Sequence, residues 1–142
     1  MDLYARNIVG WAMGHRITDD LTLDALTMAY WRRKPGQRVR LHSDQGSQYT
    51  SRRFRKLLDT LNIEASMTRR GNCWDNAVAE SFFSNLKKEK IRRSIYKNRE
   101  EARQAIFHYI EMFYNPTRRH TSNGRTSPNE YERRYFQNMK SV

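Results

Sequence analysis

Two short segments of this sequence decide its fold: residues 41–50 read LHSDQGSQYT, and residues 75–83 read DNAVAESFF. The first segment is typical of a strand end that carries an acid at its tip before a glycine-containing turn. The second segment is typical of a helix. Thirty-five residues separate Asp44 from Glu80, and Lys87 follows Glu80 two helical turns later on the same face. The two acids are therefore the first candidates for a functional site.

The combination of these segments resembles a family signature. It is similar to the second Asp, the Glu and the following basic residue of transposases and retroviral-type integrases that carry an Asp-Asp-Glu triad. The resemblance is strongest to the second-frame (OrfB-type) transposases of the bacterial insertion sequence three family, whose motif reads much like residues 42–49. The Asn72–Ala77 entry and the Glu80–Phe83 run also occur in that family's order, so the resemblance covers nearly the whole chain.

The resemblance implies DNA transposition or integration by metal-dependent strand transfer. Asp44 and Glu80 would be the catalytic residues, each holding one Mg²⁺ ion, with Mn²⁺ as a substitute, because Mg²⁺ prefers hard carboxylate oxygens. Two such ions roughly 3.5–4 Å apart can activate a 3′-hydroxyl and stabilise a leaving oxygen. We therefore expect the two carboxylates to lie close together in the fold.

Four further residues are expected to contact DNA: Lys87, Arg69, Arg70 and Asn76. Lys87 and Asn76 share the Glu80 face of the expected helix, and the two arginines lie in an expected loop, Thr68 to Trp74, that leads into it. The expected partners are the element ends and the target DNA. The family also implies a homo-multimer and no membrane partner.

The first acid of the triad has no counterpart in this sequence. In the family that Asp lies on the first strand, within a Thr-Asp-Ile-Thr-Tyr-like motif, whereas residues 2–11 here are similar to the turn after the second strand and the start of the third. Asp2 falls in that turn and is a poor substitute. We therefore expect the chain to be nearly inactive alone and to need the first Asp from an upstream segment.

Composition favours a polyanionic partner and a reduced compartment. The net charge of +12 and the pI of about 10.3 suit a protein whose Lys and Arg displace counterions from phosphates. Ribosomal and disordered basic proteins share this balance, but 37% hydrophobic residues argue against disorder. Cys73 is the only cysteine, so an internal disulfide is excluded, and no apolar run can span a bilayer. We expect a cytoplasmic protein.

The periodicity of apolar residues predicts an alternation of strands and helices. Thr18 is expected to cap the first helix with its side chain, and a stripe of Ala102, Ile106, Tyr109, Ile110 and Phe113 is expected to face a core. The predicted elements are a strand Asn7–Met13, a helix Asp19–Arg33, a strand Arg38–Ser43, a helix Ser51–Leu61, a strand Ile63–Met67, a helix from Asp75, a helix from Arg99 to Tyr114, and a last helix from Ser127-Pro128.

By resemblance this order fits an α/β fold, a ribonuclease H-like mixed sheet with helices on both faces. The fold is expected as one partial integrase core-like domain over residues 1–142, N-terminally truncated so that the first strand and most of the second are missing. Three functions remain open: the catalytic core of a transposase lacking its first acid, a non-catalytic DNA-binding remnant of a decayed element, and a metal-dependent nuclease of the same fold.

Overall fold

The computed structural model describes residues 1–68 and 76–140. The chain forms two compact units, Val9–Ala77 on the one hand and Met1–Ile8 with Val78–Val142 on the other. Each unit has its own buried residues, and each is described here by itself.

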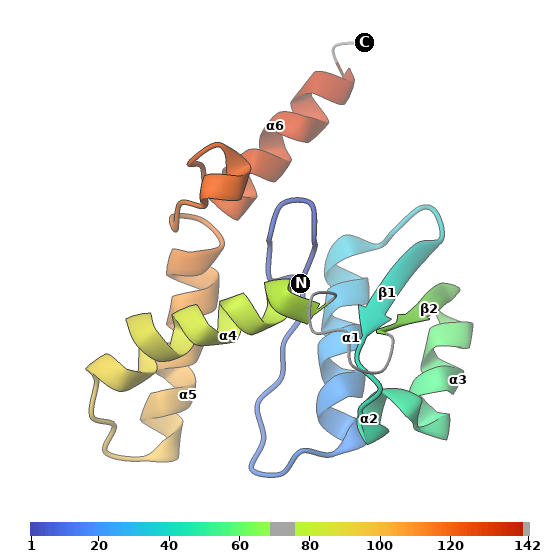
Figure 1. The fold of residues 1–142 in the computed structure, drawn as a ribbon, viewed down its shortest axis with the longest axis horizontal. Helices are drawn as coiled ribbons and strands as arrows, with labels where there is room; N and C mark the ends of the chain where they lie inside the picture. Colours follow the sequence, from blue (N-terminus) through green and yellow to red (C-terminus); the bar gives the residue numbers. More distant parts are fainter. Residues whose placement is uncertain (69–75, 141–142) are drawn as a thin grey trace. The chain divides into compact units, whose positions relative to one another are not determined.

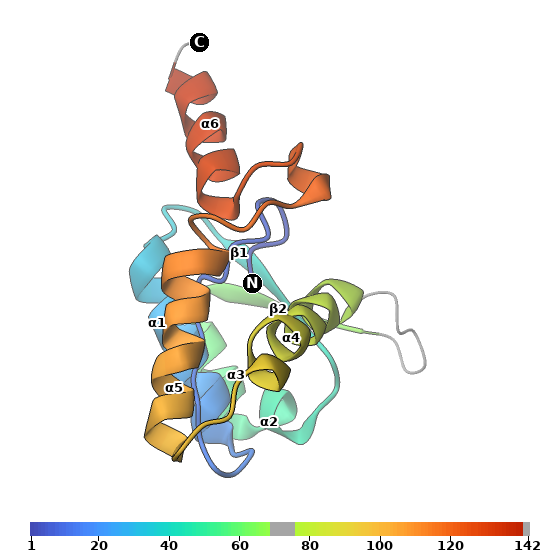
Figure 2. The ribbon, with the colours of Figure 1, turned by 90° about the vertical axis from the view of Figure 1, so that its left-hand side faces the viewer.

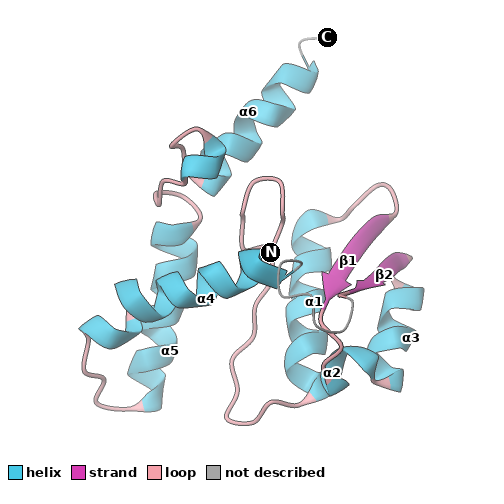
Figure 3. Ribbon diagram, viewed as in Figure 1, coloured by secondary structure: helices cyan, strands magenta, loops and turns pink. Residues whose placement is uncertain are grey.

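Strands and helices alternate in the unit Val9–Ala77. Its elements are α1 (Asp19–Arg33), β1 (Val39–Ser43), α2 (Ser47–Thr50), α3 (Arg52–Thr60) and β2 (Ile63–Met67) (Figures 1 and 3). β1 and β2 pair in parallel, with Val39 opposite Ile63 and Ser43 opposite Met67. The predicted strand–helix–strand order is confirmed, whereas the short helix α2 was not predicted.

A small apolar core holds this unit together. Leu26 of α1, Phe54 and Leu58 of α3, and Ile63 of β2 are buried against one another. The partly buried residues that pack around them are Leu23, Tyr30, Leu41, Tyr49, Leu57 and Leu61. Each helix contributes one apolar face to this core, as the periodicity of the sequence predicts.

Two helices of this unit begin in different ways. Ser51 caps α3, because its side-chain oxygen accepts a hydrogen bond from the Phe54 amide at 3.2 Å. The expected side-chain cap at Thr18 is wrong: its side chain makes no cap hydrogen bond, and its backbone carbonyl accepts the Leu21 amide instead, at 3.2 Å. α1 ends at Lys34 in the left-handed conformation, directly before Pro35-Gly36.

The predicted strand from Asn7 to Met13 is wrong. A strand needs a neighbour to complete its backbone hydrogen bonds, and the strands β1 and β2 pair with each other instead. The carboxamide of Asn115 takes the neighbour's place at Ile8: its oxygen accepts the Ile8 amide at 2.9 Å, and its nitrogen donates to the Ile8 carbonyl at 3.0 Å. Asn123 donates to the Ala5 carbonyl at 2.7 Å in the same manner. Side-chain amides therefore anchor the N-terminal segment.

The second unit consists of this N-terminal segment and a series of helices. They are α4 (Ala77–Glu89), η2 (Ile91–Arg93), α5 (Arg99–His108), η3 (Tyr109–Tyr114), η4 (Thr121–Asn123) and α6 (Pro128–Lys140). α4 runs across α5 in Figure 1 and is seen nearly end-on beside it in Figure 2. The predicted last helix is confirmed, with Pro128 as its first residue and the Ser127 side chain accepting the Glu130 amide at 3.3 Å.

A π-helical stretch, η3, continues α5 and changes which residues are buried. The Asn115 amide bonds to the Ile110 carbonyl at 3.1 Å, five residues back rather than four. The wider turn rotates the residues after it, so that Tyr114 is buried beside Tyr109 while Phe113 is 43% exposed. The prediction that Phe113 faces a core is wrong for this reason, because the 3.6-residue stripe assumes a uniform α-helix.

The α/β class is confirmed by the helices and the small parallel sheet. The ribonuclease H-like mixed sheet, with helices on both faces, and the truncation of its first strands stay predictions. No helix in the described part of the chain is long and apolar enough to cross a membrane.

Candidate active site

Asp44 stands at the exposed end of the parallel sheet, immediately after β1. Its Oδ1 accepts a hydrogen bond from the Gly46 amide at 2.9 Å, which closes a tight turn before α2. A Cβ atom on Gly46 would lie 2.9 Å from the same oxygen, closer than real Cβ contacts allow. Glycine at this position therefore lets the carboxylate keep its place against the backbone, with Asp44 facing solvent.

The end of the sheet beneath Asp44 is fixed by β2 and the residue that follows it. Thr68 donates to the Ser43 carbonyl twice, from its amide at 2.9 Å and from its hydroxyl at 3.2 Å. The Gln45 side chain donates to the Thr68 carbonyl at 3.1 Å. Asp44 thus lies between two residues that are both tied to the neighbouring strand, which holds its backbone in one position.

His42 contributes to the same support. Its ring nitrogens lie 3.0 Å from the Ser66 hydroxyl and 3.1 Å from the Thr68 hydroxyl, on the strand opposite. Ser66 is the partner of His42 in the strand register and places a hydroxyl beside the half-buried ring. The sequence contains these hydroxyls, but only the parallel register shows that they face His42.

Tyr49 of α2 lies near the acid. Burial raises the pKa of the Tyr49 phenol, and the negative charge of Asp44 raises it further. The Tyr49 ring packs edge-on against Phe54, at 5.4 Å between centroids. The Asp44 turn is thereby connected to the apolar core of its unit.

Glu80 lies in the first turn of α4, on its exposed face. Phe83 and Lys87 are exposed on the same side, whereas Phe82 and Leu86 are buried on the other. The helix therefore has a packed face and an exposed face, and Lys87 shares the exposed face with Glu80 as predicted. Asn76, directly before α4, is half-buried.

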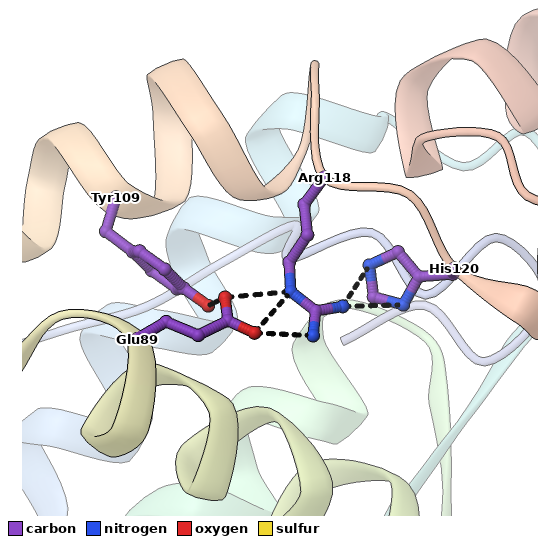
Figure 4. Close-up of polar contacts among 4 residues, drawn as sticks. All are labelled: Glu89, Tyr109, Arg118 and His120. Carbon is purple, nitrogen blue, oxygen red and sulfur yellow. Dashed lines mark hydrogen bonds and ion pairs between the residues drawn. The ribbon is translucent and has the colours of Figure 1, made fainter.

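The C-terminal end of α4 holds a polar cluster that the sequence did not predict (Figure 4). Arg118 donates to both carboxylate oxygens of Glu89, with the shortest contact at 2.7 Å, and the Tyr109 hydroxyl donates to the same carboxylate at 2.7 Å. Arg118 also contacts the ring of His120 at 3.4 Å. Only the fold brings these residues together, since 29 positions separate Glu89 from Arg118.

The ionisation of the cluster follows from these contacts. The Arg118 guanidinium lowers the pKa of the Glu89 carboxyl, and Glu89 in return raises the pKa of Arg118. Burial and the hydrogen bond to Glu89 raise the pKa of Tyr109. Burial lowers the pKa of His120, and the charge of Arg118 lowers it further. Near neutral pH, Glu89 and Arg118 therefore form an ion pair. The Tyr109 phenol and the His120 imidazole beside this pair are both neutral.

The sequence of this chain matches the models of one protein family. Two family models, both described as Integrase core domain, match residues 1–73 and residues 61–128. The chain belongs to the integrase core domain family. Its resemblance to transposases and integrases, based on the segments around Asp44 and Glu80, is confirmed.

Known relatives of this integrase core are transposases of insertion sequences. The chain is 41% identical, over 133 residues, to the transposase for insertion sequence element IS904 of Lactococcus lactis, covering 94% of this chain and 53% of that protein. It is 44% identical, over 132 residues, to transposase InsF for insertion sequence IS3A of Escherichia coli, covering 93% of this chain and 46% of that protein. The chain therefore spans about half the length of the curated relatives it matches.

The structure places the predicted residues of the integrase core in two groups. Asp44 belongs to one compact unit, and Glu80 and Lys87 belong to the other, so the approach of the two acids to a shared site stays a prediction. Arg69 and Arg70 lie outside the described residues. Within residues 1–68 and 76–140, no three His, Cys, Asp or Glu side chains gather closely enough to hold a metal ion.

Asp2 lies at the first turn of the chain. Its carboxylate accepts the amides of Tyr4 at 3.3 Å and Ala5 at 3.0 Å, and so closes the first turn of the chain. The expectation that Asp2 belongs to a turn is confirmed, and its carboxylate already has two partners there.

Proposed function

We propose that this chain is the core portion of an insertion-sequence transposase that joins 3′ DNA ends to target DNA by Mg²⁺-dependent strand transfer. Asp44 and Glu80 are the catalytic acids in this proposal. The first Asp of the triad comes from residues outside this sequence. The complete transposase acts on element ends and target DNA, as a homo-multimer.

One observation supports the proposal: in a chain of the integrase core family, two acids of the family motif are exposed on supported backbone. Asp44 follows a parallel strand, and Glu80 lies in the first turn of a helix whose other face is packed. Phosphoryl transfer requires mainly positioning and charge stabilisation, so acids on supported backbone are better suited than acids on a flexible loop. The hydrogen bonds around Thr68 and the burial of Phe82 supply this support.

The donor set suits a hard divalent cation. Asp44 and Glu80 offer carboxylate oxygens in exposed positions, which are the ligands that Mg²⁺ or Mn²⁺ takes. When bound, the cations stabilise the attacking and leaving oxygens of the transfer. The contribution of Asp44 and Glu80 is to hold them, and a third acid is needed to complete the set.

In this proposal the DNA contacts come from Lys87, Arg69, Arg70 and Asn76. Lys87 lies seven residues after Glu80 on the same exposed face, where it can bind a phosphate near the reacting end. Arg69, Arg70 and Asn76 flank the entry to α4 in the sequence. The net charge of +12 favours association with a polyanion.

The test is an assay for joining of an oligonucleotide that carries an element end. It compares this chain with a longer version that includes the first-Asp strand, each with and without Glu80→Gln or Asp44→Asn. Joining is expected in the longer version with both acids intact, and in no other sample. DNA cutting without joining would instead favour a nuclease, and DNA binding without either reaction would favour a decayed remnant. Joining by the longer version that survives Glu80→Gln would refute the proposal.

A further inference from the structure

The polar cluster at the end of α4 ties this helix to the chain that crosses it. Glu89 is the last residue of α4, Tyr109 begins the π-helical stretch, and Arg118 lies in the loop after it. Arg118 binds Glu89 through two nitrogens, Nε at 2.9 Å and Nη2 at 2.7 Å, and the Tyr109 hydroxyl binds the same carboxylate at 2.7 Å. We call these three residues the α4 clasp.

The clasp is shielded from solvent more than an ordinary surface ion pair. The side chains of Arg118 and Glu89 are 19% and 29% exposed, whereas those of Arg53 and Asp20 are both 64% exposed. The Arg118 guanidinium also lies over the Tyr114 ring, at 5.6 Å from its centre. The Glu89 carboxylate accepts hydrogen bonds from three donor atoms and is partly shielded from water, so its position relative to Arg118 is fixed. The two side chains of a solvated ion pair are not fixed in this way.

Helix geometry connects the clasp to the candidate active site. At 3.6 residues per turn, the step of nine positions from Glu80 to Glu89 corresponds to a rotation of about 180° around the helix axis. Glu89 therefore faces inward where Glu80 faces outward, and Lys87 lies on the Glu80 side. Phe82 and Leu86 share the inward side and are buried, with the Phe82 ring 5.0 Å from that of Tyr114. A rotation of α4 that moved Glu80 or Lys87 would pull Glu89 away from Arg118.

We propose that the α4 clasp is a positioning device that fixes the rotation of α4 and so sets the direction of Glu80 and Lys87. This inference rests on the proposed function, in which Lys87 binds DNA and Glu80 is a catalytic acid. Glu89, Tyr109 and Arg118 are positioning residues in this account, since they act through α4 and touch no substrate. The π-helical turn contributes by placing Tyr109 and Tyr114 on the same side of their helix, where both reach the cluster.

The first measurement is hydrogen exchange of this chain, with Glu89→Gln and Arg118→Lys as the test variants. Gln at position 89 cannot form an ion pair with Arg118, and Lys at position 118 cannot form the bidentate hydrogen bonds to Glu89. Glu130→Gln is the matched control, because Glu130 lies in the same unit and loses the same unit of charge, together with its ion pairs to Arg133 and Arg134, whose side chains are 60% and 58% exposed. Hydrogen bonds to charged groups have enough strength that exchange in the last two turns of α4 should accelerate roughly tenfold or more in the test variants. In Glu89→Gln and Arg118→Lys, the amides of α6 should exchange at the wild-type rate.

The second measurement detects a change of direction, which a merely stabilising contact would not cause. Lys87→Gln is combined with Glu89→Gln, and binding to a short DNA duplex is measured over a series of salt concentrations. Loss of one phosphate contact lowers the slope of log affinity against log salt by about 1. We expect Lys87→Gln to lower this slope by about 1 in the wild-type chain and in the Glu130→Gln variant. In the Glu89→Gln variant, Lys87→Gln should change the slope by almost nothing, because Lys87 no longer points at the phosphate.

Faster exchange in α4 together with the lost Lys87 effect is the expected result. Unchanged α4 exchange in both test variants would overturn the proposal, and so would faster exchange with the full Lys87 effect retained, since the clasp would then stabilise without positioning. If the wild-type chain binds no DNA at low salt, the proposed function fails at that step. The hydrogen-exchange result still decides whether the clasp holds α4.

Discussion

The most specific prediction about stability concerns the carboxamide of Asn115, which completes the backbone hydrogen bonds of Ile8. Asn115 is 5% exposed and Ile8 is 4% exposed, so water cannot replace the two hydrogen bonds at 2.9 and 3.0 Å. Asn115→Ala leaves the Ile8 amide and carbonyl buried without these partners. At about 1–3 kcal/mol for each of the two unsatisfied groups, the free energy of unfolding should fall by about 2–6 kcal/mol.

This loss is large relative to the total stability of a small protein, typically about 5–15 kcal/mol. Urea unfolding followed by circular dichroism should show the midpoint lowered by about 1–2 M with little change in slope. Asn138→Ala is the control, since Asn138 is exposed on α6 and its loss should change stability by less than about 0.5 kcal/mol. A further variant, Asn115→Asp, keeps the acceptor for the Ile8 amide but places a carboxylate oxygen against the Ile8 carbonyl.

Asn115→Asp should therefore be destabilised at neutral pH and recover part of its stability as pH falls and the new carboxyl gains a proton that it can donate. If Asn115→Ala matched the wild type within about 0.5 kcal/mol, the reasoning would be refuted, because two buried backbone groups could then lose their partners at no cost. Hydrogen exchange at the Ile8 amide gives an independent check and should accelerate in Asn115→Ala.

Three further predictions follow from packing, ionisation and charge. Gly10→Ala should lower the free energy of unfolding by about 3 kcal/mol, because the new Cβ would lie 2.1 Å from the Ala25 carbonyl oxygen. Gly36 has open space around it, so Gly36→Ala should leave the free energy of unfolding nearly unchanged in the same urea titration. Because the pKa of His120 is lowered in the folded chain, the unfolded chain binds more protons below about pH 6.5, and the free energy of unfolding should fall as pH drops from 7 to 5. His120→Gln should reduce this dependence on pH, whereas His15→Gln, at an exposed position, should not. With about four phosphate contacts, affinity for duplex DNA should fall roughly 100-fold between 50 and 200 mM salt with little dependence on sequence, and a salt-insensitive affinity would contradict the phosphate-contact account.

The sequence predicts those parts of this fold that depend on local patterns. α1, β1, α3 and β2 lie within one or two residues of their predicted ends, because apolar spacing and the Pro35-Gly36 stop act over a few residues. The exposed and buried faces of α4 follow from the same spacing. The motif around Asp44 and Glu80 is sufficient to identify the family.

Contacts between distant residues could not be predicted in this way. The Asn115 carboxamide that replaces a strand neighbour at Ile8 comes from 107 positions away, and nothing near residues 7–13 shows that the strand is absent. The burial of Tyr114 in place of Phe113 depends on one π-helical turn, which periodicity does not reveal. The partners of Glu89 are similarly set by how α4 meets the end of η3. In the sequence Glu89 is simply an acid among lysines at a helix end.

The most direct test of the account is the distance between residues 44 and 80. The proposed metal site requires that the strand end and the start of α4 meet, so that both carboxylates reach cations roughly 3.5–4 Å apart. Cys73 is the only cysteine, so Cys73→Ser combined with Asp44→Cys and Glu80→Cys gives one spin label at each position. Pulsed electron paramagnetic resonance then measures the distance between the labels.

If Asp44 and Glu80 serve one metal site, the labels should give one narrow distance distribution below about 20 Å, a limit that allows for the length of the label arms. A compact chain of 142 residues has a radius of gyration of about 14 Å, so labels on opposite faces would lie roughly 30 Å apart. A distribution centred at that longer distance, in the presence of DNA and Mg²⁺, would contradict the claim that Asp44 and Glu80 serve one active site.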